Sequence, residues 1–254
     1  MMHGFHVYPL PAKDALFEEL AASAQLEDVG KGRRGGVLTL VDQAGVIPLV
    51  RTTTSYRAPA QPFDAAHTKL ARQLQERAAL LTAFNNALIE TYTREYTTMG
   101  AHSDQALDLE EGSAIAVFSC YQRPDLPGSF RTLLVQEKAP GERATAVPLL
   151  HNHVVVFSVD TNRRFKHKIV LSPAASPVDN PWLAITFRTS RTFLRFSDEH
   201  ARFLDGSRLT LADDEERREF LQLRRRENQE PNFTYPRIPY TLSESDLLPP
   251  AGSR

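Results

Sequence analysis

A succession of short β-prone runs between residues 84 and 196 constrains the fold most. The runs are rich in β-branched and aromatic residues, end at turn-forming residues, and have no helical pattern between them. Short strands without intervening helices favour an antiparallel sandwich or barrel over a parallel α/β sheet. We therefore predict a mainly β fold of the α+β kind, with strands at 86–92, 114–120, 131–136, 154–159, 168–171, 183–188 and 192–196.

Helices are predicted on both sides of these runs. A short helix is expected over Lys13–Ala24, and Asp64 is placed to cap a longer helix that continues to about residue 83. A charged helix over Leu211–Asn228, capped by Thr210, precedes a proline-rich tail that wraps the surface or frays.

No linker composition divides the chain into independent domains. We expect residues 1–63 to form an N-terminal layer that acts as a substrate lid within the same domain. Residues 64–210 would then form the core, and residues 211–254 the C-terminal helix and tail. Within the first segment, β-prone runs at 37–40 and 46–50 flank the turn-forming residues 42–45, which predicts a hairpin.

Composition excludes several classes of protein. Lys and Arg number 30 against 31 Asp and Glu, so the net charge of -1 gives no bulk affinity for polyanions. The one cysteine, Cys120, allows neither an intramolecular disulfide nor a zinc site with two thiolates. The most apolar stretch, 154–159, is too short to cross a bilayer. We expect a monomeric, cytoplasmic protein without membrane association.

Three residues are candidate metal ligands. His102 and Asp104 are two positions apart, so on an extended chain both side chains face one side and reach the same ion. His167 lies in a later β-prone segment and offers a third ligand. Two histidines and one carboxylate form a facial triad that leaves half of an octahedral Fe(II) open for a cosubstrate and dioxygen. Taken singly, the His102–Asp104 pair fits a solvated turn equally well, and His167 is more typical of a partly buried histidine. His151 and His153 compete as ligands.

The run at 182–188 alternates between two faces. Leu183, Ile185 and Phe187 form an apolar face, whereas small residues on the other face lead to Arg188. A pocket for a carboxylate requires free space and a guanidinium whose N–H groups can bind both oxygens, and this face offers both. A lone arginine is nevertheless more often a surface residue.

Four ordered segments resemble the AlkB-like Fe(II)/2-oxoglutarate dioxygenases, over about residues 84–196. They are Met99-Gly-Ala-His-Ser-Asp104, Val154-Val-Val-Phe157, Arg163-Arg-Phe-Lys-His-Lys-Ile169 and Leu183-Ala-Ile-Thr-Phe-Arg188. The resemblance implies a double-stranded β-helix (jelly roll) with flanking helices. It implies oxidation of a substrate C–H bond, by hydroxylation or oxidative N-demethylation, with release of succinate and carbon dioxide.

The resemblance also implies roles for individual residues. His102, Asp104 and His167 would hold Fe(II), Arg188 would bind a carboxylate of 2-oxoglutarate, and Tyr92 would hydrogen-bond this cosubstrate.

Two positions depart from the family pattern. The family has a second arginine where this chain has Trp182, and an asparagine where this chain has Glu90. The distal carboxylate of the cosubstrate thus lacks its usual partner. Either Arg191 or Arg131 compensates, or the cosubstrate sits differently, or the fold survives without the activity.

The substrate is less constrained than the chemistry. The family places its lid N-terminal to the barrel, where this chain offers Arg51, Thr52, Thr54 and Tyr56 to a phosphate or a carboxylate. Basic residues beside His167 leave nucleic acid open as a partner, but no aromatic-basic pattern suited to base stacking is found. Alkylated nucleic acid or nucleotide is therefore one substrate class, and a small molecule or protein side chain is another. A catalytically inactive binding module is the third alternative.

Overall fold

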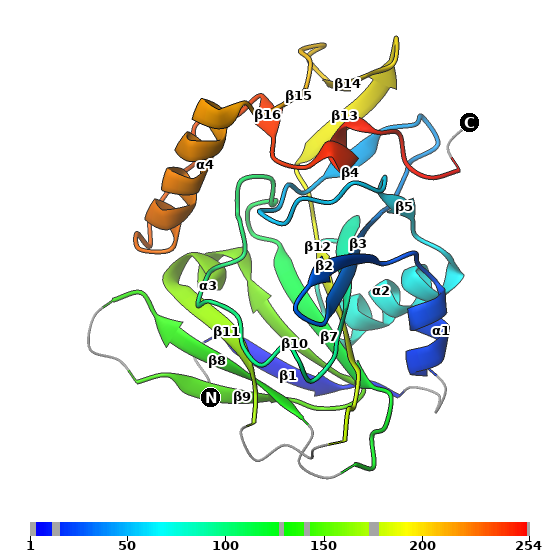
Figure 1. Ribbon diagram of the computed structural model, residues 1–254, viewed down its shortest axis with the longest axis vertical. Helices are drawn as coiled ribbons and strands as arrows, with labels where there is room; N and C mark the ends of the chain where they lie inside the picture. Colours follow the sequence, from blue (N-terminus) through cyan, green and yellow to red (C-terminus); the bar gives the residue numbers. More distant parts are fainter. Residues whose placement is uncertain (1–3, 12–15, 127–129, 140–142, 173–177, 253–254) are drawn as a thin grey trace.

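The computed structural model describes residues 4–11, 16–126, 130–139, 143–172 and 178–252. Its main element is a large sheet in the order β1-β10-β7-β12-β6-β3-β2, antiparallel throughout, with β5 added in parallel beside β3 (Figure 1). The strands of this sheet are β1 (Phe5–Pro9), β2 (Glu27–Gly30), β3 (Arg33–Thr39), β5 (Gln61–Pro62), β6 (Asn86–Tyr92), β7 (Ala114–Tyr121), β10 (His153–Ser158) and β12 (Trp182–Arg188).

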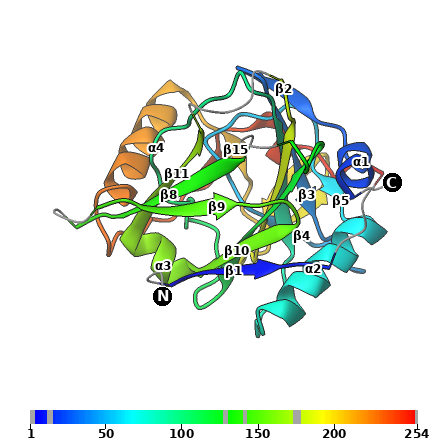
Figure 2. The same cartoon turned by 90° about the horizontal axis from the view of Figure 1, so that it is seen from below.

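A smaller antiparallel sheet packs against the large one. It has the order β11-β8-β9 and consists of β8 (Arg131–Glu137), β9 (Thr145–Leu149) and β11 (Phe165–Leu171) (Figure 2). Leu133 and Val147 from this sheet share one apolar core with Val117 and Val155 from the large sheet. The predicted double-stranded β-helix is confirmed.

Helices cover the other face of the large sheet. In α1 (Leu16–Ala22) and α2 (Ala65–Arg77), Leu20 and Leu74 are fully buried in an apolar cluster that includes residues of β12, and α4 (Asp214–Glu227) lies on the opposite side of the molecule (Figure 1). The short α3 (Val159–Arg164) joins β10 to β11. Within the described residues, no helix is long and apolar enough to span a membrane.

Short elements complete the end of the molecule beyond the large sheet. They are β4 (Ile47–Leu49), β13 (Thr192–Ser197) and β14 (His200–Phe203) in one sheet, β15 (Thr210–Leu211) and β16 (Tyr240–Thr241) in another, and the 3-10 helix η1 (Glu244–Leu247).

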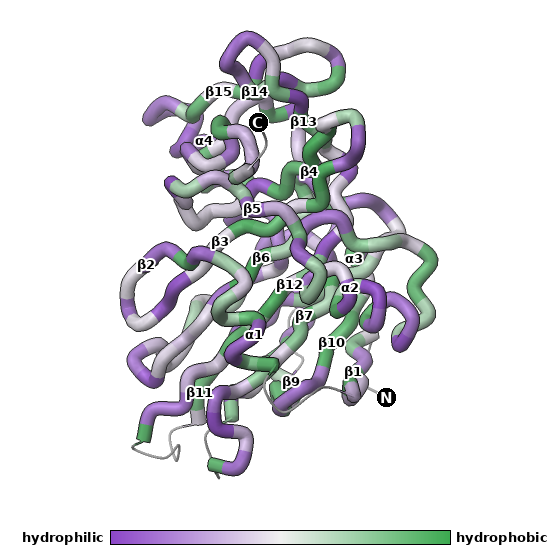
Figure 3. The backbone as a smooth tube through the Cα atoms, turned by 90° about the vertical axis from the view of Figure 1, so that its right-hand side faces the viewer, coloured by the Kyte–Doolittle hydropathy of each residue, from purple (hydrophilic) through white to green (hydrophobic). Residues whose placement is uncertain are grey.

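The predicted alternation of β12 is confirmed. Leu183, Ile185 and Phe187 pack toward the helices, whereas Trp182 and Ala184 belong to the core shared with the smaller sheet. Figure 3 shows the hydrophobic residues concentrated along β6, β12, β7 and β10. Strands that are buried on both faces therefore form the rigid floor on which the site is built.

The predicted hairpin over 37–50 is wrong. Its turn does form, because the Asp42 amide donates to the Val46 carbonyl at 3.2 Å and the Val46 amide donates to Asp42 Oδ1 at 2.7 Å. The two strands then separate: β3 pairs with β6 along its whole length, and β4 pairs with β13. Long-range pairing thus overrides the local turn signal.

Two predicted helix boundaries also change. The helix that begins after Asp64 ends at Arg77 rather than near 83, because Ala79 takes a left-handed conformation (φ 50°). Asp213, not Thr210, caps α4, since Asp213 and Glu216 form a reciprocal capping box. Residues 5–39 supply β1, β2 and β3 to the large sheet, and the closure of residues 1–63 as a lid stays a prediction.

Arg51 ties three segments of the chain together. Its Nε and Nη2 donate to the Asp108 carboxylate at 3.0 and 2.7 Å, and its Nη1 donates to the carbonyls of Ile238 and Tyr240. Arg51 and Asp108 are 4% and 1% exposed, so the pair is desolvated and depends on this geometry. The C-terminal tail is therefore packed in place around residues 238–242, which rules out fraying there.

We predict that Arg51→Met destabilises the fold by about 3–5 kcal/mol, because it leaves the Asp108 carboxylate buried without a counter-charge. Urea unfolding followed by circular dichroism measures the change. Arg237→Met is the matched control: Arg237 pairs with Asp205, but its side chain is 70% exposed, so no measurable change is expected. Equal midpoints for the two variants would contradict the role assigned to Arg51.

Candidate metal centre and cavity

The three predicted metal ligands meet at one point. One ligand atom from each of His102, Asp104 and His167 lies within 4.8 Å of the others. Two backbone hydrogen bonds fix the approach, because the His102 amide donates to the His167 carbonyl (2.9 Å) and the reverse bond is 2.7 Å. No other group of three His, Cys, Asp or Glu side chains converges in this way among the described residues. His151 and His153 thus stand apart from this centre.

Hydrogen bonds orient the ligand atoms. His102 Nδ1 lies 2.8 Å from the Gly100 carbonyl, which places the proton on Nδ1 and leaves Nε2 free for a metal. Asp104 Oδ2 accepts from Arg188 Nε at 2.9 Å, while Oδ1 lies 3.3 Å from His167 Nε2. The donor set is thus two imidazoles and one carboxylate with a guanidinium behind it, which suits non-haem Fe(II).

The electrostatics favour the metal-binding protonation states. Burial, and secondarily the neighbouring His167, lowers the pKa of His102 to about 4, so its imidazole is neutral at pH 7. Burial opposes ionisation of Asp104, but Arg188 and the two histidines outweigh it and hold the pKa of that carboxyl well below its usual range.

The loop between the ligands is held from several sides. Asn162 Oδ1 accepts from the Asp104 amide at 2.8 Å, and its Nδ2 donates to the Asp104 carbonyl at 2.7 Å. From α4 and its C-terminal end, Asn228 Oδ1 accepts from the Ser103 amide and Arg224 Nη2 donates to the Ser103 carbonyl. The backbone on both sides of the metal-facing atoms is therefore fixed before any metal binds.

The sequence analysis missed these supporting residues. Asn162 is 1% exposed and Arg224 is 8% exposed, although neither lies in an apolar pattern. The only signal for α4 is the spacing of Arg224 and Asn228, which places both on one face of a charged helix.

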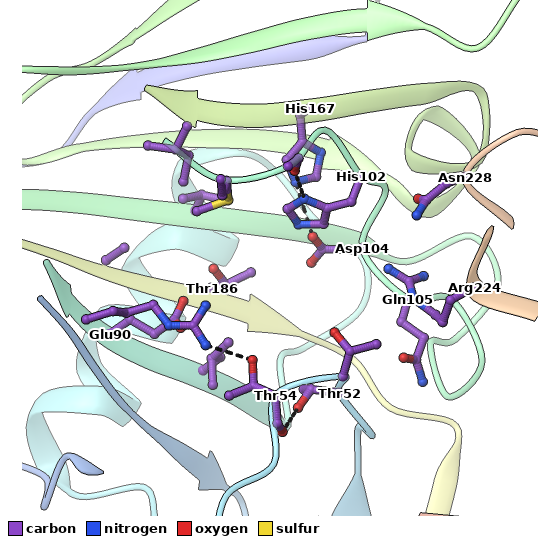
Figure 4. A pocket seen from close by; sticks show the side chains of 18 of the residues that line it. Thr52, Thr54, Glu90, His102, Asp104, Gln105, His167, Thr186, Arg224 and Asn228 are labelled. Atoms are coloured by element: carbon purple, nitrogen blue, oxygen red, sulfur yellow. Dashed lines mark hydrogen bonds and ion pairs between the residues drawn. The ribbon is translucent and has the colours of Figure 1, made fainter. Parts of the chain in front are cut away.

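A cavity of about 430 Å³ extends from the triad between the two sheets. Figure 4 shows His167, His102 and Asp104 on one side of it and Glu90 and Thr54 on another. The apolar part of its wall comes from both sheets and consists of Leu88, Val117, Leu133, Phe157, Ile169 and Ala184. Leu221, Arg224 and Arg225 of α4 and the C-cap residue Asn228 also line it.

Both predicted cosubstrate residues line this cavity. Arg188 lies beside the triad, with its Nε on Asp104. The Tyr92 hydroxyl is not directed at open space, since it donates to Glu90 Oε2 at 2.6 Å. The binding roles of Arg188 and Tyr92 stay predictions.

The predicted substrate residues divide into two pairs. Thr52 and Thr54 line the cavity, but they lie in a bent loop in which Thr52 Oγ1 donates to the Thr54 carbonyl, and not on an extended face. Arg51 also lines the cavity, yet its guanidinium is committed to Asp108 and to the tail. Tyr56 is 1% exposed and is absent from the lining.

Trp182 fills the place of the family arginine with an indole. It is fully buried, donates from Nε1 to Ser119 Oγ at 2.6 Å, and its ring centroid lies 4.9 Å from that of Tyr92. Neither predicted substitute reaches the cavity. Arg131 lies against the Tyr92 and Trp182 rings and donates to the Tyr96 and Thr93 carbonyls.

Arg191, the other predicted substitute, pairs with Glu111 at 3.5 Å and lines a separate cavity. Neither arginine can therefore replace, within the cavity, the family arginine whose position Trp182 occupies.

Comparison with known proteins agrees with this geometry. The profile of the 2OG-Fe(II) oxygenase superfamily matches residues 37–188, which include the triad, Tyr92 and Arg188. A solved structure described as "The structure of OsALKBH1" is similar in fold, with a TM-score of 0.51 and 15% sequence identity. The similarity covers 74% of this chain and 99% of that chain. No curated protein matches the sequence.

We predict that Asp104→Ala lowers the affinity for Fe(II) by more than about a hundredfold. Removing a residue that only hydrogen-bonds a metal ligand costs about 10- to 100-fold in affinity, and removing a ligand itself costs more. Anaerobic calorimetric titration with Fe(II) measures it. Asp125→Ala, at an exposed position, is the control and should bind one equivalent like the wild type. Undiminished affinity in Asp104→Ala would refute the site.

Proposed function

Because this chain belongs to the 2OG-Fe(II) oxygenase superfamily, we propose that it oxidises a C–H bond of an organic substrate with dioxygen, consuming 2-oxoglutarate and releasing succinate and carbon dioxide. His102, Asp104 and His167 hold the Fe(II). The observation that carries the proposal is the convergence of these three side chains at the wall of a cavity large enough for small molecules.

The iron, when bound, supplies the oxidising chemistry, and the protein supplies binding and position. Arg188 offers a guanidinium at the metal end of the cavity, and its bond to Asp104 holds that guanidinium in place. A carboxylate of the cosubstrate beside the metal is its natural ligand. The apolar side chains from both sheets line the cavity and disfavour water beside the reacting groups.

Buried polar groups without hydrogen-bond partners line the cavity beside the metal loop and α4. Gln105 follows the last ligand of the loop, lines the cavity at 8% exposure, and has no hydrogen-bond partner on either amide atom. Arg224 Nε is likewise buried without a partner. A substrate that carries its own donors and acceptors would satisfy these groups. We therefore favour a small polar molecule, or one polar group of a larger molecule, as the substrate.

We predict that anaerobic addition of 2-oxoglutarate to the Fe(II)-loaded protein produces a visible charge-transfer band, because a donor set of only three protein groups would leave Fe(II) able to bind the oxo acid. His167→Ala should lose the band, whereas the control His200→Ala, outside the cavity, should keep it. Absence of the band in the wild type would overturn the proposed function.

The reaction products distinguish N-methylated nucleic acid from the other substrate classes. In air, an N-methylated single-stranded oligonucleotide is expected to give no formaldehyde above the background of His167→Ala, while slow succinate release continues. Formaldehyde at parity with succinate would instead establish oxidative N-demethylation of nucleic acid.

A further inference from the structure

A charged cluster occupies the part of the cavity away from the metal ligands. Arg33 Nε lies 3.4 Å from Glu90 Oε1, and Arg33 Nη2 donates to Thr54 Oγ1 at 2.8 Å. Tyr92 donates to the second oxygen of the same carboxylate. All four residues line the cavity, and Figure 4 shows Glu90 and Thr54 across it from Asp104.

Arg33 retains donors for a ligand. A guanidinium carries more N–H groups than these two contacts use, and the Arg33 side chain is 18% exposed at the cavity wall. Thr54 accepts from Arg33 and keeps its own hydroxyl proton to donate. An incoming carboxylate therefore meets a cation and a hydroxyl at this end.

The register of the sheet relates Arg33 to the position at which the family pattern has its second arginine. Arg33 lies directly opposite Tyr92 in the β3–β6 pair, and Tyr92 lies directly opposite Trp182 in the β6–β12 pair. Arg33 and Trp182 thus occupy one row, two strands apart. From this row Arg33 lines the cavity, whereas Trp182 does not.

We propose that Arg33, assisted by Thr54, binds the distal carboxylate of 2-oxoglutarate in this chain. Glu90 orients the guanidinium through its ion pair and is itself held by Tyr92. The inference rests on the proposed function, in which Arg188 takes the other end of the cosubstrate.

The test compares two oxo acids on each protein. 2-Oxopentanoate has the carbon chain of 2-oxoglutarate without the distal carboxylate, and Mn(II)-loaded protein permits calorimetric binding without turnover. For Arg33→Met we expect the Kd of 2-oxoglutarate to rise about tenfold or more, and that of 2-oxopentanoate to change less than about twofold.

Arg34→Met is the matched control. Arg34 neighbours Arg33 on the same strand, but it is exposed and donates to the Leu26 carbonyl outside the cavity. Both acids should bind this variant as they bind the wild type. An unchanged Kd of 2-oxoglutarate in Arg33→Met would overturn the proposal, and so would an equal loss of both acids, which would place the effect in the fold.

A second pair of variants tests the hydroxyl. Thr54→Val should weaken the binding of 2-oxoglutarate several-fold and spare that of 2-oxopentanoate, whereas Thr68→Val, at an exposed position of α2 outside the cavity, should alter neither. Equal behaviour of the two threonine variants would remove Thr54 from the proposal. Wild-type protein that binds neither acid would overturn the proposed function together with this inference.

Discussion

Two backbone hydrogen bonds between His102 and His167 are the interaction on which the rest of the site depends. They join segments that are 65 positions apart in the sequence, and they do so at the residues whose side chains face the metal position. Because the bonds are made by backbone groups, the spacing of the two imidazoles follows from the chain path and not from side-chain packing. Two hydrogen bonds between the Asn162 side chain and the Asp104 backbone then position the third ligand.

The C-terminal region serves this centre through a chain of contacts. Arg51 holds the tail at Ile238 and Tyr240, and the tail residues share an apolar cluster with Phe220 of α4. That packing sets α4 so that Arg224 reaches the Ser103 backbone. Loss of the buried Arg51–Asp108 pair would therefore act on the metal loop without touching a ligand. Arg51 therefore has a structural role, although the sequence analysis predicted that it contacts the substrate.

The sequence pattern predicted those features that depend on residues close together in the chain. The bounds of β6 follow from its β-prone run, the two faces of β12 follow from alternation, and the triad follows from residue types at short spacing with one distant histidine. The failures lie where partners are remote: the turn at 42–45 predicted a hairpin, but β6 and β13 compete successfully for its strands. Arg33 was missed for the same reason, since its position in the cavity depends on the β3–β6 register, which no local pattern encodes.

The row that joins Arg33, Tyr92 and Trp182 gives the two departures from the family pattern one physical explanation. An indole at 182 leaves a stacked, uncharged surface beside Tyr92, with the cation of Arg131 placed behind the rings. The guanidinium of Arg33 on β3 needs a partner that fixes its position. Glu90 provides it through an ion pair, and lies two residues from Tyr92 on the same face of β6. Glu90 and Trp182 then have connected physical roles: Trp182 provides no cation from β12, and the Glu90 carboxylate positions Arg33, which provides one from β3.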